Sequence, residues 1–280
     1  MDKGKNIAFV VHSGREEARA CAGQAEAFLE SAGYHVAYPR DGARQDVYSM
    51  VITFGGDGTL LLGAGEAIAC GCPLLGINLG TVGFLTEGEP KNLLSLMTRV
   101  LEGDYQTESR GLLRISVNEE TESVLALNDA VITRGGFARL IQVDTFVGDE
   151  QWDTFTADGI IAATPTGSTG YSLSAGGPVL APGVEGIVIT PVCAHSLRHC
   201  PCVVPAASRI RFQLKPEREQ RGDLQIDGRS RRMLTAGDTV HVTGAGQELK
   251  LVRMGDYCFF EVMRRKFLAW SQPDERGAGA

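Results

Sequence analysis

Apolar runs alternate with helical patterns over the first hundred residues of the chain, and this alternation restricts the possible folds more than any other feature. Strands that alternate with helices are typical of a parallel sheet with helices on both faces. We therefore expect a doubly wound α/β domain over residues 1–107. The predicted strands are 6–11, 35–38, 47–54 and 73–78, and the predicted helices lie at about 16–31, after Gly58 and at 90–102.

After about residue 108 the helical periodicity nearly disappears, and short β-branched runs separated by turn signals replace it. This pattern predicts an all-β, β-sandwich-like domain over residues 108–254. A helical pattern returns at 255–270, which we expect to pack on the first domain, and residues 271–280 are expected to be disordered. The predicted strands of the second domain are 112–117, 124–127, 130–133, 141–147, 159–163, 187–191, 210–214 and 239–242.

The charge balance of the chain argues against nucleic acid as a partner. The formal net charge of the 280 residues is −7, whereas proteins that bind nucleic acid usually carry a basic surface. No apolar run approaches the roughly 20 residues that span a bilayer, and the N-terminal residues lack the apolar core of a signal peptide. We therefore expect a cytoplasmic protein with neither a membrane nor a nucleic acid as partner.

Seven cysteines occur in the chain, an odd number that does not suggest a disulfide framework. The stretch from Cys193 to Cys202 also contains His195, His199 and Cys200. Neighbouring residues of an extended strand point to opposite faces, so few of these side chains could converge on one metal ion. We expect buried thiols there and no metal site built by the protein.

The sequence Gly-Gly-Asp-Gly-Thr at residues 55–59 follows an apolar run and precedes a helical pattern. Its glycines allow a ligand to approach the backbone N–H groups, and the positive end of the following helix favours phosphate. The carboxylate of Asp57 would repel phosphate unless a cation lies beside it or a hydroxyl gives it a proton. The motif therefore indicates phosphoryl transfer to an alcohol, while an ordinary turn that needs positive φ remains the alternative.

A second glycine-rich turn, residues 78–84, also follows a predicted strand. The carboxyl ends of parallel strands lie at one edge of a sheet, where ligands bind. The two turns should therefore share one crevice.

Two further polar stretches lie in the second half of the chain. Residues 158–178 read DGIIAATPTGSTGYSLSAGGP, and their many hydroxyls and glycines favour contact with a polar ligand over a solvated loop. Asn128 and Asp129 interrupt an apolar run. They form either a turn or bulge or a site for ribose, because Asn donates and accepts hydrogen bonds while Asp accepts from hydroxyls.

Taken together, these motifs resemble those of bacterial NAD kinases. GGDGT also occurs in lipid kinases and phosphofructokinases, whereas the asparagine–acid pair combined with TPTGSTGYSLSAGGP is far more specific. The matching segments follow the family order: VITFGGDGTLL (51–61), GINLGTVGFLTE (76–87), ALNDAVITRG (126–135), TADGIIAATPTGSTGYSLSAGGP (156–178) and ITPVCAHSLRHCPCVVP (189–205).

The resemblance implies transfer of the γ-phosphate of ATP, or of a polyphosphate phosphoryl group, to the 2′-hydroxyl of the adenosine ribose of NAD, giving NADP. Asp57 would be the catalytic acid/base that orients the hydroxyl and accepts its proton. The remaining substrate-binding residues would be Gly56, Gly58 and Thr59 at the first turn, Phe84 and Thr86 at the cleft wall, Asn128 and Asp129 at the ribose, Asp158 at the nicotinamide end, Thr169, Tyr171 and Ser174 at the adenine, and Arg139, Thr156, Thr164, Gly170, Ser172 and Arg229.

The resemblance also implies Mg²⁺ or another divalent cation, bound with the phosphoryl donor, and a homo-oligomer, either a dimer or a tetramer. Two positions depart from the common family pattern. Arg229 follows an Asp-Gly turn where Gln is frequent, and Thr156 stands where some relatives carry Arg. Both positions bear on the choice between NAD and NADH and on the choice of donor.

Two rival interpretations remain open from the residues. A lipid kinase of the diacylglycerol kinase type shares GGDGT, but it would need a basic membrane-facing patch that this acidic chain does not clearly show. A non-catalytic NAD(P)-binding sensor could dispense with the acid, so the presence of Asp57 argues against it.

Overall fold

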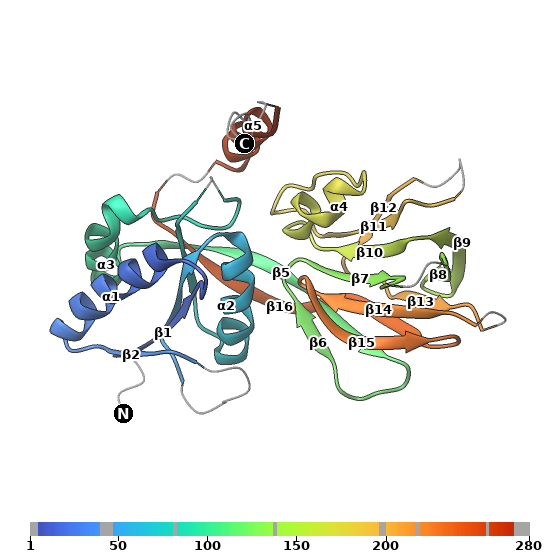
Figure 1. Ribbon diagram of the computed structural model, residues 1–280, viewed down its shortest axis with the longest axis horizontal. Coiled ribbons are helices and arrows are strands. Elements are labelled where there is room, and N and C mark those ends of the chain that lie inside the picture. The colour runs from blue at the N-terminus through green and yellow to red at the C-terminus, as the bar shows by residue number, and fades with distance from the viewer. Residues whose placement is uncertain are drawn as a thin grey trace, which may run out of the picture. The chain divides into compact units, whose positions relative to one another are not determined.

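The computed structural model describes residues 5–39, 47–80, 83–136, 139–195, 200–216, 219–255 and 258–271. The chain forms two compact units, drawn in Figure 1. Unit 1 comprises Met1–Ser109 together with Leu249–Ala280, and unit 2 comprises Arg110–Glu248. Two long strands, β5 (Gln106–Val117) and β16 (Thr239–Arg253), contribute residues to both units.

Unit 1 contains a parallel sheet with the strand order β2-β1-β3-β4, followed by the C-terminal end of β16. The strand bounds are β1 Asn6–Val11, β2 His35–Ala37, β3 Met50–Gly55 and β4 Leu74–Asn78. Each of these four strands overlaps a run that the sequence pattern predicted. The reason is that buried parallel strands are nearly continuous apolar runs.

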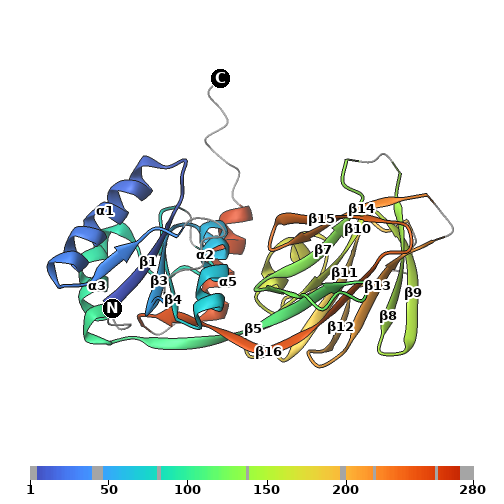
Figure 2. The same cartoon turned by 90° about the horizontal axis from the view of Figure 1, so that it is seen from below.

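Helices cover both faces of this sheet, which confirms the doubly wound prediction (Figures 1 and 2). α1 and α3 pack on the face that carries Phe9, Phe54 and Leu75. α2 packs on the other face, where Gly63 allows close approach to Thr53. The helix bounds are α1 Glu16–Ser31, α2 Asp57–Cys70, the 3₁₀ turn η2 Pro90–Asn92 and α3 Leu93–Glu102.

The C-terminal helix α5 (Phe259–Ser271) belongs to unit 1, as its helical pattern predicted. The ring of Phe259 packs against that of Phe84, with 6.3 Å between the ring centres. The expected disorder of the tail concerns residues that lie almost entirely outside the described chain. No helix among the described residues is long and apolar enough to cross a membrane.

Unit 2 contains two sheets (Figure 2). Buried side chains from both sheets form one large core, and a smaller buried cluster includes Val131, Ile161 and Val188 of the first sheet. The first sheet is antiparallel in the order β12-β11-β10-β7-β14-β15, and the second contains β13, β8 and β9 beside β16, with β5 paired to β6. The remaining bounds are β6 Val124–Ala126, β7 Asp129–Thr133, β8 Ile141–Val147, β9 Glu150–Ala157, β10 Gly159–Ala163, β11 Gly186–Val192, β12 Cys202–Pro205, β13 Ile210–Leu214, β14 Arg221–Ile226 and β15 Arg229–Thr235.

The β-sandwich-like expectation is confirmed, with two differences of detail. Strands β9, β12, β14 and β15 were missed because several of them carry polar or exposed side chains, as in Arg229–Thr235 at a sheet edge. Residues 164–175, for which no helix was predicted, contain the 3₁₀ turn η3 (Gly167–Thr169) and the short helix α4 (Tyr171–Ser174). Unit 2 is therefore not wholly β.

Two glycines of α2 provide a matched test of this packing. A Cβ on Gly63 would lie 2.4 Å from the Thr53 methyl group, whereas a Cβ on Gly65 meets no heavy atom within 4 Å. Gly63→Ala should lower the free energy of unfolding by about 1–3 kcal/mol through overpacking. Gly65→Ala should raise it by about 0.5–1 kcal/mol through helix propensity. Urea denaturation of both variants checks this, and equal effects at the two sites would contradict the packing of α2.

Candidate active site

Asp57 is the first residue of α2, directly after the end of β3. The described part of the loop after β4 (residues 79–80 and 83–89, the β4 loop) lies beside it because β3 and β4 are adjacent parallel strands. The backbone N–H of Phe84 donates to Asp57 Oδ2 at 2.9 Å, and that of Leu85 donates to Oδ1 at 3.1 Å. The two glycine-rich turns therefore do share one edge of the sheet, as predicted, and the β4 loop orients the carboxylate.

The glycines of the first turn differ in what surrounds them. A Cβ on Gly55 would lie 2.1 Å from Thr59 Oγ1, so this glycine is required by internal packing. A Cβ on Gly56 or Gly58 would meet no heavy atom within 4 Å. The backbone at Gly56 and Gly58 is therefore open to a ligand at the positive end of α2.

Arg253 anchors the β4 loop through an ion pair and a hydrogen bond. Its side chain is only 4% exposed and forms ion pairs with Glu87 at 3.2 Å and Glu108 at 2.8 Å. The same guanidinium donates to the carbonyl of Leu85 at 3.3 Å. Since Leu85 is one of the two amide donors to Asp57, this buried ionic network supports the geometry of the carboxylate.

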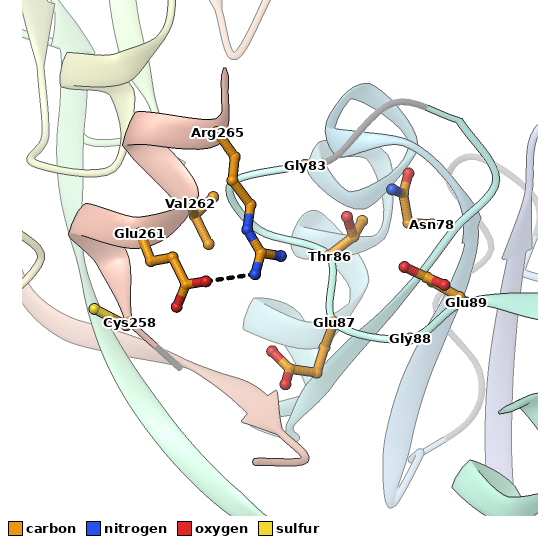
Figure 3. A pocket seen from close by; sticks show the side chains of 10 residues that line it. All are labelled: Asn78, Gly83, Thr86, Glu87, Gly88, Glu89, Cys258, Glu261, Val262 and Arg265. Atoms are coloured by element: carbon orange, nitrogen blue, oxygen red, sulfur yellow. Dashed lines mark hydrogen bonds and ion pairs between the residues drawn. The ribbon is translucent and has the colours of Figure 1, made fainter. Parts of the chain in front are cut away.

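A pocket of about 260 Å³ lies between the β4 loop and α5 (Figure 3). Thr86 lies on its wall, and the Oγ1 atom of Thr86 is buried without a hydrogen-bond partner in the described structure. Glu87 and Glu261 also line the pocket, and Glu261 pairs with Arg265. The pocket lining therefore mixes acidic and basic side chains, and the open backbone of Gly56 and Gly58 stays the predicted phosphate site.

Lys266, which the sequence motifs did not predict as a site residue, also lies at this site. Its Nζ lies 3.3 Å from Asp57 Oδ2 and 4.5 Å from the centre of the Phe84 ring. Lys266 stands 209 positions away from Asp57 in the chain, within a helix whose sequence predicted only packing. No local pattern could have found this pair.

In unit 2, Asn128 lies between β6 and β7, and hydrogen bonds to its backbone groups hold it in place. The Asp227 carboxylate accepts hydrogen bonds from the N–H groups of Leu127, Asn128 and Asp129 at 2.8, 2.7 and 3.1 Å. The carbonyl of Asn128 accepts a hydrogen bond from the Thr164 N–H at 2.8 Å. Asn128 Oδ1 is buried and has no hydrogen-bond partner in the part of the chain described here, so it can accept one from a ligand.

Asp227 was also missed as a site residue, although its Asp-Gly turn was noted. It occupies the hairpin between β14 and β15, with φ +48°. The signal was present, because an acid in an Asp-Gly turn tolerates this conformation. Its contact with residues 127–129 depends on tertiary structure.

Asp129 is buried, and only 5% of its surface is exposed. Burial, together with the negative charge of Asp227, raises the pKa of Asp129 to about 7. Burial also raises the pKa of Asp227, against the opposing effect of its three amide donors. Asp129 therefore changes its protonation near neutral pH.

The hydroxyl side chains of residues 164–174 differ in their surroundings: some form hydrogen bonds within unit 2, and others are exposed. Thr164 Oγ1 donates to the Leu127 carbonyl at 2.6 Å, Ser172 pairs with Thr190 at 2.8 Å, and Thr169 donates to the Thr166 carbonyl at 3.1 Å. These groups hold the segment together. Tyr171 is 43% exposed and Ser174 is also exposed, while Gly170 lies near the Asn128 amide group.

The remaining predicted residues lie around unit 2. Asp158 forms an ion pair with Arg134 at 2.6 Å, and Thr156 accepts from Gln142 at 3.0 Å. Arg139 and Arg229 are exposed. The structure thus joins Asn128, Asp129, Thr164 and Gly170 closely, and it leaves the binding roles of all these residues as predictions.

The cysteine stretch differs from its prediction. Cys193 and Cys200 are exposed rather than buried, because they lie in the loop between β11 and β12. His199 lies outside the described residues. Among the residues that are described, no group of three or more His, Cys, Asp and Glu side chains could hold a metal ion.

The raised pKa of Asp129 predicts a pH-dependent stability. An aspartate in an unfolded chain titrates near 3.9, so between that pH and about 7 the folded chain holds the extra proton. This contribution is complete below about pH 4 and is lost as the pH rises through 7. From about pH 5 to pH 8, the free energy of unfolding of the native protein should fall by about 3 kcal/mol relative to Asp129→Asn. Urea denaturation measures it.

The exposed Asp149 supplies the control for this measurement. Asp149→Asn should leave the pH profile of stability unchanged. A difference between the native protein and Asp129→Asn that does not vary with pH would contradict the buried titration.

Known proteins match both halves of the chain. A family model described as the ATP-NAD kinase N-terminal domain matches residues 41–105, and one described as the ATP-NAD kinase C-terminal domain matches residues 127–254. An NAD kinase of Heliobacterium modesticaldum is 40% identical over 230 residues, covering 81% of this chain and 80% of that protein. An NAD kinase of Lachnoclostridium phytofermentans is 37% identical over 258 residues, covering 86% and 90%.

Solved structures share the fold. A yeast NADH kinase complexed with NADH superposes with a TM-score of 0.86 at 24% identity, covering 98% of this chain and 89% of that one. An NAD kinase from Archaeoglobus fulgidus in complex with ATP gives 0.72 at 24% identity, covering 93% and 98%. Both family models and relatives that match over about four fifths of their length lead to one conclusion: the chain belongs to the NAD kinase family.

Proposed function

We propose that the protein transfers the γ-phosphoryl group of ATP, or of a polyphosphate, to the 2′-hydroxyl of the adenosine ribose of NAD. The observation that carries this proposal is the position of Asp57. It combines an oriented carboxylate with the open, positive end of α2. Two related solved structures, one complexed with NADH and one with ATP, support the two substrate classes.

In the proposed reaction, the 2′-oxygen attacks the γ-phosphorus, and the bond from that phosphorus to the bridging oxygen breaks. The hydroxyl proton passes to Asp57, and ADP leaves with the negative charge. A carboxylate is too weak a base to ionise a ribose hydroxyl in advance. In a loose transition state this is unnecessary, because bonding to the nucleophile lags behind. Asp57 therefore orients the hydroxyl and accepts its proton late.

The donor would arrive as its Mg²⁺ complex, in which the cation neutralises part of the phosphate charge. This agrees with a phosphate site built from backbone amides at Gly56 and Gly58. We keep the remaining predictions as proposals: the homo-oligomer, the cytoplasmic location and the divalent cation. The two rivals differ in ligand, since a lipid kinase would bind diacylglycerol and a sensor would bind NAD without turnover.

Unit 2 would recognise the nucleoside part of NAD. Asn128 offers a buried acceptor without a partner in the described structure, which suits a ribose hydroxyl. Asp129 next to it is protonated at acidic pH and ionised above about pH 7, so it could change from donor to acceptor. Tyr171 exposes part of its ring and is proposed to contact the adenine.

Replacement of Asp57 tests the proposal. Asp57→Asn removes the proton acceptor but keeps the shape, so NADP formation should fall by about 10²- to 10⁴-fold. The NADP-forming assay uses the protein, NAD, Mg²⁺ and either ATP or polyphosphate, and an NADP-specific dehydrogenase reads the product. Binding of NAD, measured by thermal shift, should persist in the variant.

Glu66 provides the matched control, because it is another acid of α2, away from the first turn. Glu66→Gln should keep native turnover. Native turnover in Asp57→Asn would remove the catalytic role of Asp57. If the native protein binds NAD but forms no NADP with either donor, the sensor interpretation replaces the kinase.

A further inference from the structure

α5 directs a basic side chain at the carboxylate of Asp57. Lys266 Nζ lies 3.3 Å from Asp57 Oδ2, and the Lys266 side chain is only 17% exposed. The preceding residue of the same helix, Arg265, has a side chain that is 62% exposed. The orientation of Lys266 is therefore set by packing and is not shared by its neighbour.

Phe84 supports this orientation through two contacts with α5. Its ring packs on Phe259 at the start of α5, and the ammonium of Lys266 lies 4.5 Å from its centre. A cation over an aromatic face is attracted by the ring quadrupole. Because the Phe84 N–H also donates to Asp57, one residue of the β4 loop positions both members of the ion pair.

A phosphoryl donor creates a charge problem at this site. Several negative charges must come close to Gly56 and Gly58, next to the carboxylate of Asp57. The positive end of α2 supplies only about half an elementary charge. The divalent cation proposed to arrive with the donor would neutralise part of the phosphate charge, and a further positive charge beside Asp57 would reduce the repulsion between its carboxylate and the phosphates. The sequence carries no lysine in the turn itself.

We propose that Lys266 is the cationic ligand of the phosphoryl donor, a role that lysine fills from within the phosphate loop in other kinases. This assignment rests on the proposed kinase function. An ammonium carries three N–H donors. One already reaches Asp57 Oδ2, and the others can bind phosphate oxygens of the donor.

The proposal adds one element to the transfer step. Lys266 gives up no proton and forms no covalent bond. It holds phosphate oxygens whose negative charge increases as the bond to the bridging oxygen breaks. As its contact moves from Asp57 towards phosphate, the Oδ2 atom of Asp57 becomes available to the ribose hydroxyl proton.

A purely structural ion pair is the alternative. Partly exposed pairs of this kind contribute little to stability, and ordering a long lysine side chain costs conformational entropy. A structural role would affect the two substrates equally. A cationic ligand of the donor affects ATP and leaves NAD binding intact.

The test uses three variants of the full chain. Lys266→Met keeps most of the apolar stem and removes the charge, whereas Lys266→Arg keeps the charge. Arg264→Met removes a charge from an exposed position of the same helix and is the matched control. For each variant, kcat and KM are measured with ATP and with NAD varied in turn. Thermal shifts are measured separately with NAD and with inorganic tripolyphosphate plus Mg²⁺.

For Lys266→Met we expect kcat/KM for ATP to fall by about 10- to 100-fold, as for the loss of one charge-assisted contact. KM for NAD and stabilisation by NAD should stay native, while stabilisation by tripolyphosphate should be lost. Lys266→Arg should recover part of both losses, and Arg264→Met should behave as the native protein.

Three results would overturn the proposal: native ATP kinetics in Lys266→Met, a rise in activity, which would identify Lys266 as an inhibitory residue, or an equal rise of KM for ATP and for NAD. Failure of the kinase function itself is distinguishable, because then the native protein forms no NADP. The tripolyphosphate measurement still reports on Lys266 in that case. If Lys266→Met does not fold, stabilisation of Lys266→Arg by tripolyphosphate decides, and its absence contradicts the assignment.

Discussion

The site of unit 1 depends on the two hydrogen bonds that hold the Asp57 carboxylate. They come from consecutive backbone amides, Phe84 and Leu85, so each carboxylate oxygen has its own donor. Hydrogen bonds to a charged acceptor are stronger and more directional than neutral ones. A carboxylate held in this way can orient a hydroxyl without further rearrangement, which agrees with the modest chemical task that a loose transition state leaves to the protein.

The buried Arg253 anchors the described part of the β4 loop, because it pairs with Glu87 and Glu108 and donates to the Leu85 carbonyl. A buried ion pair contributes little net stability once desolvation is counted. Its contribution here is one of position, because Arg253 contacts Leu85, one of the two residues whose amides donate to Asp57.

Unit 2 places an acid under a different constraint. The Asp227 carboxylate accepts hydrogen bonds from the three amides of residues 127–129. Asp129 is therefore buried close to the carboxyl group of Asp227. Burial and that neighbour raise the pKa of Asp129 to about 7. One carboxylate thus organises the backbone of the segment, and the other keeps a proton that a ligand or a pH change can shift. Asn128 Oδ1, which is buried and has no hydrogen-bond partner among the residues that the structure describes, can accept a hydrogen bond from a ligand.

Much of the fold and part of the site follow from sequence alone. The alternation of strands and helices predicted the parallel sheet of unit 1. Glycine-rich turns at the ends of two predicted strands indicated that the first turn and the β4 loop lie close together. Both predictions were possible because side-chain burial and backbone freedom are local properties. Tertiary structure alone decided the pairings across the chain: Lys266 with Asp57, Asp227 with residues 127–129, and Arg253 with Glu87 and Glu108. These depend on packing between distant segments, and neither the exposed edge strands nor the partners of a buried charge leave a periodic pattern in sequence.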